Sequence, residues 1–361
     1  MNGKVGQEAR RIQEDFASEW TLDERDLLRP ESHQLWLKHL ATSDPEIRPR
    51  LHEEFLGSGP LKSLLEDPSI TEIIVNGPQE IWFEQRGEFS RLGDQFLSLK
   101  TFQDFVDRLC AEIDIKVDLS KPFADGKWQG FRVHLALAPL THCERHVTLR
   151  RISHSPWTLA KLEQLEWAPA KALTILREQL SGGKNILFVG PTGCGKTSVL
   201  GACLMELAEN ERVVILEDTD ELPRPNSAST KMLTRSELGP GLPEITLGDL
   251  LKQSLRMRPK RLVVGEVRGA EAKDLLLALA TGHSGSLGSL HASDARQALL
   301  RLEMLVQMGA PQWNLHAIRQ LIQLSIDTIV VCEKNAGHRC LEGIYQVAGL
   351  ESIGFLLDQL A

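Results

Sequence analysis

Cysteine is scarce in this 361-residue chain, and its spacing forms no motif. The cysteines are Cys110, Cys143, Cys194, Cys203, Cys332 and Cys340. No two of them are separated by two residues, so the sequence has neither a zinc-ribbon nor a thiol-redox signature. Reduced, unpaired cysteines are typical of a cytoplasmic protein.

Long apolar runs are also missing. No stretch approaches the roughly 18 consecutive apolar residues that a membrane span requires. The charged N-terminus, MNGKVGQEARRIQEDF, does not fit a secretory signal peptide. We therefore expect no transmembrane segment and a cytoplasmic location, with membrane contact made only through partner proteins.

A basic excess is absent as well. The chain has 41 lysines and arginines against 49 aspartates and glutamates, which gives a formal net charge of -8. Proteins that bind nucleic acid generally carry a basic patch or stripe, so we expect no direct contact with nucleic acid. The short basic run Arg258–Arg261 is predicted to be solvated surface.

The chain is long enough for two domains, and its character changes along its length. Residues 1–60 are predicted to form a helical N-terminal segment, because apolar residues recur there at helical spacing. Residues 61–151 are predicted to form an α+β domain of ordinary size. Residues 152–170 are predicted to be a linker running into a short helix, and residues 171–361 form the last predicted domain.

The predicted α+β domain is rich in short strands. Residues 70–92 alternate between strand-forming residues and turn signals, which lie at Asn76–Pro78 and Arg86–Gly87. The remaining predicted elements are an amphipathic helix over 101–114 and strands over 130–140 and 146–152.

Strands and helices alternate in the last domain. Near-continuous runs of valine, isoleucine and leucine between helices are typical of a parallel sheet covered on both faces. The predicted strands are 184–190, 212–218 and 261–267, and the predicted helices are 197–208, 247–257 and 269–282. A terminal β-hairpin is predicted over 326–347, turning at 335–337. The predicted fold class is α/β with a parallel-rich sheet, preceded by the smaller α+β domain and the helical segment.

A phosphate-binding loop joins the first strand and helix of this domain. Gly190–Thr197 matches G-x-x-x-x-G-K-[ST] in full, with the preceding strand and following helix that the motif requires. Its glycines let backbone N–H groups point at phosphates, and the helix N-terminus adds positive potential. Lys196 is expected to bind the β- and γ-phosphates, and the Thr197 hydroxyl to bind Mg²⁺. The predicted nucleotide-binding residues are Gly190, Pro191, Thr192, Gly193, Cys194, Gly195, Lys196, Thr197 and Ser198.

Acidic residues end two later strands of the predicted sheet. Glu266 follows Gly265 at the end of one strand. In proteins with a phosphate-binding loop, an acid that binds Mg²⁺ is expected at such a strand end. Ligands of open α/β sheets lie beyond the carboxyl ends of the strands, which favours a functional role for Glu266. A second acidic cluster at the end of another strand faces the same crevice if both strands share the sheet; it contains Glu217, Asp218, Asp220 and Glu221.

Two histidines lie in a segment rich in small residues. Residues 281–295 are predicted to be a loop between two helices, and the glycines indicate a close approach to something. His283 and His291 are each either structural or a sensor of the γ-phosphate. The residues alone leave both interpretations open.

Four stretches, taken in order, resemble the Walker A, Asp, Walker B and His boxes of the secretion ATPase superfamily. They are GPTGCGKT, ILEDTDEL, LRMRPKRLVVGEVRGAEAKDLL and TGHSGSLGSLHASDARQALLRLEML. The superfamily comprises hexameric motors of type II and type IV secretion and of type IV pili, and the resemblance covers residues 61–347. ITEIIVNGPQEIWFEQRGEF, LRMRP and GEVRGAEA are most similar to the CpaF-type ATPases of Tad/Flp pilus assembly. The chain lacks the four-cysteine insertion of many type II relatives, and its His box has serines where relatives commonly have threonines and an asparagine.

The resemblance implies a RecA-like P-loop motor domain with ATP and Mg²⁺ as cofactors. It also implies a homo-hexamer that works on an inner-membrane platform protein of a pilus or secretion system. Glu217 is then a candidate for polarising the attacking water, Glu266 for acting on Mg²⁺ or on that water, and His291 for sensing the γ-phosphate. The preceding domain of such motors also supplies arginines, which match Arg132 and Arg150 or Arg151.

Other functions remain open at this point. A DNA translocase of the same superfamily is disfavoured by the acidic balance of the chain. A nucleotide-gated regulatory or scaffold subunit with little turnover is disfavoured by the intact Lys196, Glu217 and Glu266. A small-molecule kinase would usually carry an arginine-rich lid insertion, which the sequence does not show.

Overall fold

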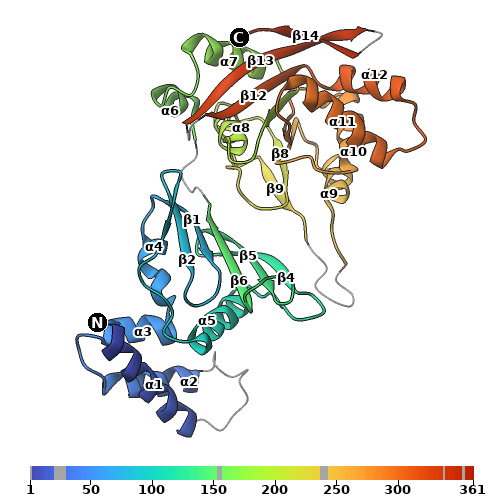
Figure 1. Cartoon of the computed structure of the whole chain (residues 1–361). Coiled ribbons are helices and arrows are strands. Elements are labelled where there is room, and N and C mark those ends of the chain that lie inside the picture. Colours follow the sequence, from blue (N-terminus) through green and yellow to red (C-terminus); the bar gives the residue numbers. More distant parts are fainter. Residues whose placement is uncertain (1, 20–29, 153–156, 236–242, 336–337, 352–353) are drawn as a thin grey trace. The chain divides into compact units, whose positions relative to one another are not determined.

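The computed structural model describes residues 2–19, 30–152, 157–235, 243–335, 338–351 and 354–361. Its contacts divide the chain into two compact units, Met1–His154 and Ser155–Ala361, here called unit 1 and unit 2 (Figure 1). The sequence-based division at residues 60, 151 and 170 stays a prediction. Residues 153–156 of the predicted linker and 336–337 of the predicted hairpin turn lie outside the described residues.

Unit 1 begins with helices, as the spacing of its apolar residues predicts. The helices are α1 (Asn2–Glu19), α2 (Pro30–Ala41), α3 (Arg48–Leu56) and the short α4 (Lys62–Glu66). Three aromatic side chains stack on one another, with ring centroids 3.9 Å apart for Phe16 and Trp36 and 4.4 Å apart for Trp36 and Phe55. This stack joins α1, α2 and α3 into one apolar cluster.

A six-stranded antiparallel sheet forms the rest of unit 1, in the order β3-β2-β1-β6-β5-β4. Its strands are β1 (Ile70–Val75), β2 (Ile81–Gln85), β3 (Glu88–Arg91), β4 (Phe123–Trp128), β5 (Phe131–Leu137) and β6 (Arg145–Arg151). Helix α5 (Leu99–Glu112) starts with a capping box between Ser98 and Thr101. Its side chains Phe102 and Phe105 fill the core between the helix and the sheet.

Unit 2 contains an eight-stranded sheet in the order β14-β13-β12-β7-β11-β10-β8-β9. Its strands are β7 (Ile186–Gly190), β8 (Val213–Glu217), β9 (Thr230–Leu233), β10 (Arg261–Val264), β11 (Leu287–His291), β12 (Thr328–Asn335), β13 (His338–Glu351) and β14 (Gly354–Gln359). The strands from β12 to β9 run parallel, and β13 and β14 add an antiparallel edge. Every residue of β7, β8 and β10 is buried. The predicted α/β fold with a parallel-rich sheet is therefore confirmed.

Helices cover both faces of this sheet (Figure 1). They are α6 (Leu159–Gln164), α7 (Ala170–Ser181), α8 (Lys196–Leu204), α9 (Leu247–Ser254), α10 (Glu271–Ala280), α11 (Ala295–Gly309) and α12 (Leu315–Ser325). Successive strand side chains point to opposite faces, so Leu187 packs with α9–α12 while Phe188 packs with α6–α8. Of the helices that the structure describes, none combines the length and the apolar character of a membrane span.

The prediction of a loop over residues 281–295 is wrong in its central part. Leu287–His291 is β11, an inner strand that lies between β7 and β10. Its small residues Gly288 and Ser289 carry little hydrophobic pattern, so the strand is hard to recognise in the sequence. The consequence for the site is large, because His291 becomes the last residue of a buried parallel strand.

The prediction of solvated surface for Arg258–Arg261 is also wrong for Arg261, which is 5% exposed. Its Nε donates to Glu211 at 2.5 Å and its Nη1 donates to the carbonyl oxygen of Gly285 at 2.9 Å. This arginine begins β10 and ties it to the neighbouring segments. A buried charge is tolerated there because it is paired and hydrogen-bonded.

Candidate functional site

The phosphate-binding loop connects β7 to α8 and turns on two glycines. Gly190 has φ 151°, and a Cβ there would lie 2.2 Å from the carbonyl oxygen of Cys332. Gly195 has φ 96° and is the N-cap of α8. Both positions therefore require glycine. The turn places the N-terminus of α8 beside the loop, an arrangement that suits an anion.

Lys196 lies within this loop and is 7% exposed. Its Nζ donates to the carbonyl oxygens of Gly190 at 2.9 Å and Pro191 at 2.8 Å. A buried ammonium group favours a nearby anion, and a phosphate in the loop supplies one. The placement therefore fits the predicted contact between Lys196 and the β- and γ-phosphates.

Three sequence boxes meet at Lys196. Its Nζ lies 3.2 Å from Nδ1 of His291, and Nε2 of His291 lies 3.1 Å from Oε1 of Glu266. An ammonium group only donates, so Nδ1 accepts and the imidazole proton sits on Nε2, where it is donated to Glu266. Burial lowers the pKa of His291, and Lys196 lowers it further. His291 is therefore neutral at pH 7 and links the loop lysine to the acid of the Walker B box.

Arg268 connects Glu266 to the Asp box. Its Nη2 donates to Oε2 of Glu266 at 2.7 Å, and its Nη1 lies 3.6 Å from Asp218. Burial raises the pKa of Glu266, but the hydrogen bond and charge of Arg268, with His291 and Lys196, outweigh it and bring the pKa below its ordinary value. Glu266 is therefore ionised at neutral pH.

Glu217 ends β8 and is 3% exposed. Its Oε1 accepts from the backbone N–H groups of Glu221 at 3.0 Å and Leu222 at 2.9 Å. Oε2 is buried with no hydrogen-bond partner among the described residues, and Nζ of Lys231 lies 3.6 Å from it. Burial raises the pKa of Glu217 to about 7, against those two N–H groups. A carboxylate with this pKa is suited to accept a proton near neutral pH.

A glycine makes room for Glu217 on the neighbouring strand. A Cβ on Gly265 would lie 3.0 Å from Cγ of Glu217. The carbonyl oxygen of Gly265 accepts from the Ser289 hydroxyl at 2.5 Å. The glycine before the Walker B acid therefore lies close to residues of both neighbouring strands, β8 and β11.

The donor set around the loop fits Mg²⁺. The Thr197 hydroxyl and the ionised Glu266 carboxylate are hard oxygen donors at the N-terminus of α8 and after β10. Mg²⁺ is usually held by one or two protein oxygens together with substrate phosphates and water. Both residues thus fit the role that the sequence assigns to them.

Cys194 lies in the loop and interacts with Cys332 and Lys196. The thiol is fully buried. A hydrogen bond from Cys332 lowers the pKa of Cys194 to about 6, burial opposes this, and Lys196 favours the thiolate. The charge of Lys196, which favours the thiolate, also favours a phosphate oxygen in the loop.

In unit 1, Arg132 on β5 and Arg150 on β6 lie directly opposite each other. Lys127 is the partner of Arg132 on the other side, and Asp125 lies 3.7 Å from Arg132. Like charges opposite each other in a sheet are destabilising. Glu72 on β1 lies opposite Arg150 on its other side, so Asp125 and Glu72 neutralise part of the charge of Lys127, Arg132 and Arg150. This cationic row therefore keeps a net positive charge, which favours an anion.

Arg151 faces the other way and has a different environment. Its guanidinium lies 4.4 Å from the ring centroid of Phe131. Its Nε donates to the carbonyl oxygen of Ile70 at 2.7 Å, and its Nη2 donates to those of Leu65 at 2.9 Å and Asp67 at 2.7 Å. These bonds tie the end of β6 to α4 and to the start of β1. Of the three predicted arginines, Arg132 and Arg150 therefore remain the candidates for contact with a phosphate.

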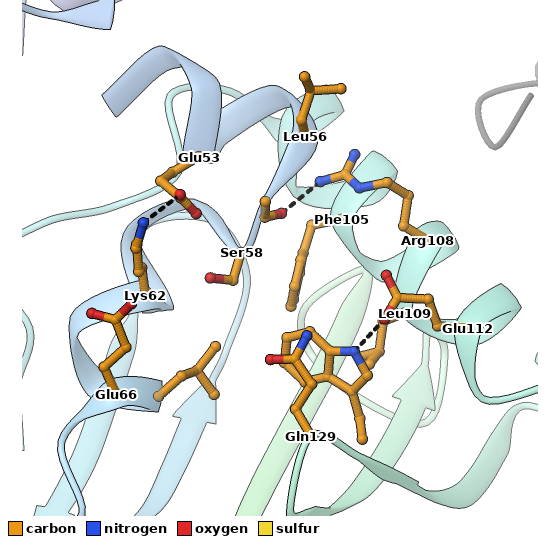
Figure 2. A pocket seen from close by; sticks show the side chains of 13 residues that line it. Glu53, Leu56, Ser58, Lys62, Glu66, Phe105, Arg108, Leu109, Glu112 and Gln129 are labelled. Atoms are coloured by element: carbon orange, nitrogen blue, oxygen red, sulfur yellow. Dashed lines mark hydrogen bonds and ion pairs between the residues drawn. The ribbon is translucent and has the colours of Figure 1, made fainter. Parts of the chain in front are cut away.

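A pocket of about 240 Å³ lies in unit 1 among α3, α4 and α5 (Figure 2). Its polar groups mostly satisfy one another. Lys62 pairs with Glu53 at 2.7 Å, Trp128 donates to Glu112 at 2.6 Å, and Arg108 donates to the Gly57 carbonyl at 2.9 Å (Figure 2). The loop of unit 2, with its convergent charges, is the better candidate for the chemistry.

Two cations of the site are not predicted from the sequence. Lys231 lies on β9, a four-residue edge strand without a strong pattern. Arg268 follows Glu266 by two residues, and its spacing is visible in GEVRG, although its contact with Asp218 depends on the tertiary fold. His283 is structural, since its Nδ1 lies 3.0 Å from the carbonyl oxygen of Ala278 at the end of α10.

Comparison with known proteins places the chain among secretion proteins. The family model for type II/IV secretion system proteins matches residues 54–348. The chain is 30% identical over 302 residues to the putative conjugal transfer protein Rv3659c of Mycobacterium tuberculosis, covering 81% of this chain and 85% of that protein. It is 30% identical over 301 residues to the type IV secretion system protein PtlH of Bordetella pertussis, covering 76% of this chain and 88% of that protein.

A solved structure supports the fold. The structure of the pilus retraction motor PilT with bound ADP has a TM-score of 0.57 and 19% identity, covering 79% of this chain and 80% of that chain. At this identity the likeness concerns the fold alone. The predicted RecA-like architecture is thereby confirmed.

Proposed function

The chain belongs to the type II/IV secretion system protein family, and we propose that within it the chain is a P-loop ATPase that hydrolyses Mg-ATP to power a secretion or pilus machine. The observation that carries this proposal is the line of contacts from Lys196 through His291 to Glu266, at 3.2 Å and 3.1 Å. It joins three sequence boxes at one edge of a parallel sheet, where ligands of such sheets bind.

Each residue then has a distinct role. The N-terminus of α8 and Lys196 bind the phosphates, while Thr197 and Glu266 hold Mg²⁺. When bound, Mg²⁺ neutralises charge on the transferred phosphoryl group. The neutral His291 holds Glu266 in place and senses the γ-phosphate through Lys196. Glu217, with a pKa of about 7 and a buried Oε2, accepts the proton of the attacking water.

We further propose that the working form is a homo-hexamer in the cytoplasm, docked on an inner-membrane platform protein. Identical head-to-tail contacts close into a ring when the rotation permits. Arg132 and Arg150 of unit 1 then contribute positive charge to a bound γ-phosphate. Movement of unit 1 during the ATP cycle would couple the chemistry to mechanical work.

The proposed machine is a Tad/Flp-type pilus. ITEIIVNGPQEIWFEQRGEF, LRMRP and GEVRGAEA support this branch, as does the lack of a four-cysteine insertion. Two relatives carry the names of a conjugal transfer protein and a type IV secretion protein, so protein secretion is the alternative within the family. Deletion of the gene should abolish surface pili if the first assignment is right and leave them intact if secretion is the function.

Phosphate release tests the ATPase proposal. The wild type should hydrolyse ATP, and Lys196→Ala should abolish both turnover and tight nucleotide binding. Glu266→Gln should retain bound ATP and lose at least about 100-fold in kcat, because the amide lacks the charge that acts on Mg²⁺ or water. Wild-type turnover in Glu266→Gln would remove Glu266 from the mechanism.

Two further outcomes separate the alternative functions. Tight ATP binding without hydrolysis in the wild type would favour a nucleotide-gated scaffold. Turnover that rises with added DNA and falls with salt would favour a DNA translocase. A strict monomer in light scattering, with and without a non-hydrolysable ATP analogue, would contradict the ring.

A further inference from the structure

The hairpin of β12 and β13 lies along the phosphate-binding loop. The carbonyl oxygen of Cys332 on β12 would be 2.2 Å from a Cβ on Gly190. On β13, Nε of Arg339 donates to the carbonyl oxygen of Gly193 at 2.9 Å. Cδ of Arg339 would lie 3.3 Å from a Cβ on Gly195. One arginine of the terminal hairpin therefore contacts the middle of the loop.

The bond to Gly193 does not neutralise the positive charge of Arg339. An arginine has five N–H donors, and the bond to Gly193 engages only Nε. The side chain is exposed. Within the part of the chain that the structure describes, no carboxylate lies within 4.0 Å of Arg339, and no acceptor is bonded to its Nη1 or Nη2. Four donors and a full positive charge thus remain available beside the loop.

We propose that Arg339 is a nucleotide-binding residue supplied by the same chain. The Nε bond holds the guanidinium against the loop, and Nη1 and Nη2 bind phosphate oxygens of the nucleotide. Guanidinium groups are well suited to this because their planar fork matches a phosphate. This inference rests on the proposed nucleotide-binding function of the loop.

The sheet order indicates which phosphates Arg339 contacts. β11 and β12 flank β7 on opposite sides. His291 approaches Lys196 from β11, on the side of Glu266, where the γ-phosphate is attacked. Arg339 approaches from the hairpin side, so it should contact the α- and β-phosphates. Such a contact lies away from the γ-phosphoryl group that is attacked and is made in the ground state as well as in the transition state, so it should change affinity far more than kcat.

A purely structural role for Arg339 makes a different prediction. If the residue only holds Gly193 in place, its loss disturbs the shape of the loop, including the position of Lys196. kcat then falls together with affinity, and the salt dependence of binding stays unchanged. Charge binding predicts unchanged kcat and a weaker salt dependence, because one phosphate contact is removed.

Titration of a fluorescent ADP derivative and a fluorescent ATP analogue tests the proposal. Arg339→Ala should bind both about tenfold more weakly, with kcat within about twofold of the wild type and a flatter salt dependence. Arg339→Lys should recover part of the affinity, since it keeps the charge but loses the fork.

Arg91→Ala is the matched control. Arg91 is also exposed, and its Nη2 donates to a backbone carbonyl, that of Gln79, at 3.2 Å. It lies on the edge strand β3 of unit 1, outside the four sequence boxes. Its removal should leave nucleotide affinity and salt dependence unchanged.

The outcomes separate this inference from the proposed function. A wild type that binds nucleotide while Arg339→Ala binds equally well overturns only the inference. A fall in kcat with an unchanged salt dependence in Arg339→Ala also overturns it. A wild type that binds ADP without hydrolysing ATP overturns the ATPase proposal, and the affinities still decide on Arg339. A wild type that binds no nucleotide overturns both.

Discussion

The two units position their functional side chains by different means. In unit 2, Gly190, Glu217 and His291 are the last residues of β7, β8 and β11. Parallel strands bring residues that are distant in sequence to one sheet edge, so the backbone itself assembles the site. In unit 1, Arg150 and Arg151 are consecutive in one antiparallel strand and face opposite sides of the sheet. There, a shift of one residue separates a functional candidate from a structural one.

The largest expected effect is a fall in kcat when Arg132 or Arg150 of unit 1 is replaced. If the cationic row acts on a γ-phosphate, each alanine variant should lower kcat by up to about 10³-fold. Nucleotide affinity should change much less, because the cation acts mainly in the transition state. Arg145→Ala is the control. Arg145 lies on the same strand β6 and is paired with Asp107 at 2.5 Å, so kcat should not change.

A mixing experiment asks which chain uses these arginines. Arg150→Ala keeps an intact loop, and Lys196→Ala keeps intact arginines. If Arg150 acts across a subunit boundary, the mixture of the two inactive variants should regain part of the activity. Unchanged turnover in both arginine variants would leave unit 1 without a catalytic role.

The sequence predicts unit 2 better than unit 1 for a physical reason. Lys196, Glu266 and His291 lie in motifs next to strand ends, and the parallel sheet brings strand ends together. The loop contact of Arg339 is not predictable, because it depends on the pairing of β13 with β12. The strand that ends in His291 is missed because its residues are small. In unit 1, the pattern TLRR predicts a strand without revealing which arginine faces the core.

The second-largest expected effect is on the pH dependence of stability, which the two glutamates of unit 2 should influence in opposite ways. The pKa of Glu217 is about 7 in the folded state against 4.5 in the unfolded chain. The folded state therefore keeps a proton that the unfolded chain has lost, and stability falls as the pH rises from 4.5 to 7. The loss amounts to about 3 kcal/mol at 1.36 kcal/mol per pKa unit. Glu217→Gln should remove this fall, as the midpoint of thermal unfolding at pH 5 and pH 8 would show.

Glu266→Gln provides the contrast, since the pKa of Glu266 is lowered. Its contribution to stability is present above its unfolded pKa and is lost as the pH falls below about 4.5. The two variants should thus change the pH profile in opposite directions. Parallel profiles for the wild type and Glu217→Gln would contradict the assignment of Glu217 as the buried base.

The third-largest expected effect is on the stability of unit 1, where the adjacent residues Arg150 and Arg151 should differ. Arg151→Ala removes four bonds to carbonyl oxygens, those of Leu64, Leu65, Asp67 and Ile70, and the contact with the Phe131 ring. We expect a loss of about 2 kcal/mol in the stability of unit 1, measured by hydrogen exchange of peptides from β1 and β6. Arg150→Ala should change this exchange little, because its side chain is exposed. Equal loss of protection in both variants would remove the distinction between the two faces.

The smallest effect tests how closely the strand ends of unit 2 are packed. Gly265→Ala puts a methyl group 3.0 Å from Cγ of Glu217, so the carboxylate must move by a few tenths of an ångström. On the neighbouring strand, Gly288→Ala meets only ordinary contacts at 3.7 Å, with Leu187 and Val264. Both substitutions add one methyl group to a buried strand region, and both should change stability by about 1 kcal/mol or less.

Only the first substitution should change the chemistry. A misplaced base lowers kcat, so Gly265→Ala should lose about three- to tenfold while Gly288→Ala stays near the wild type. Steady-state phosphate release on both variants, with ADP affinity measured alongside, checks this. Equal kcat in the two variants would mean that the position of Glu217 is not limiting, and Glu266 would then be the better candidate for the base.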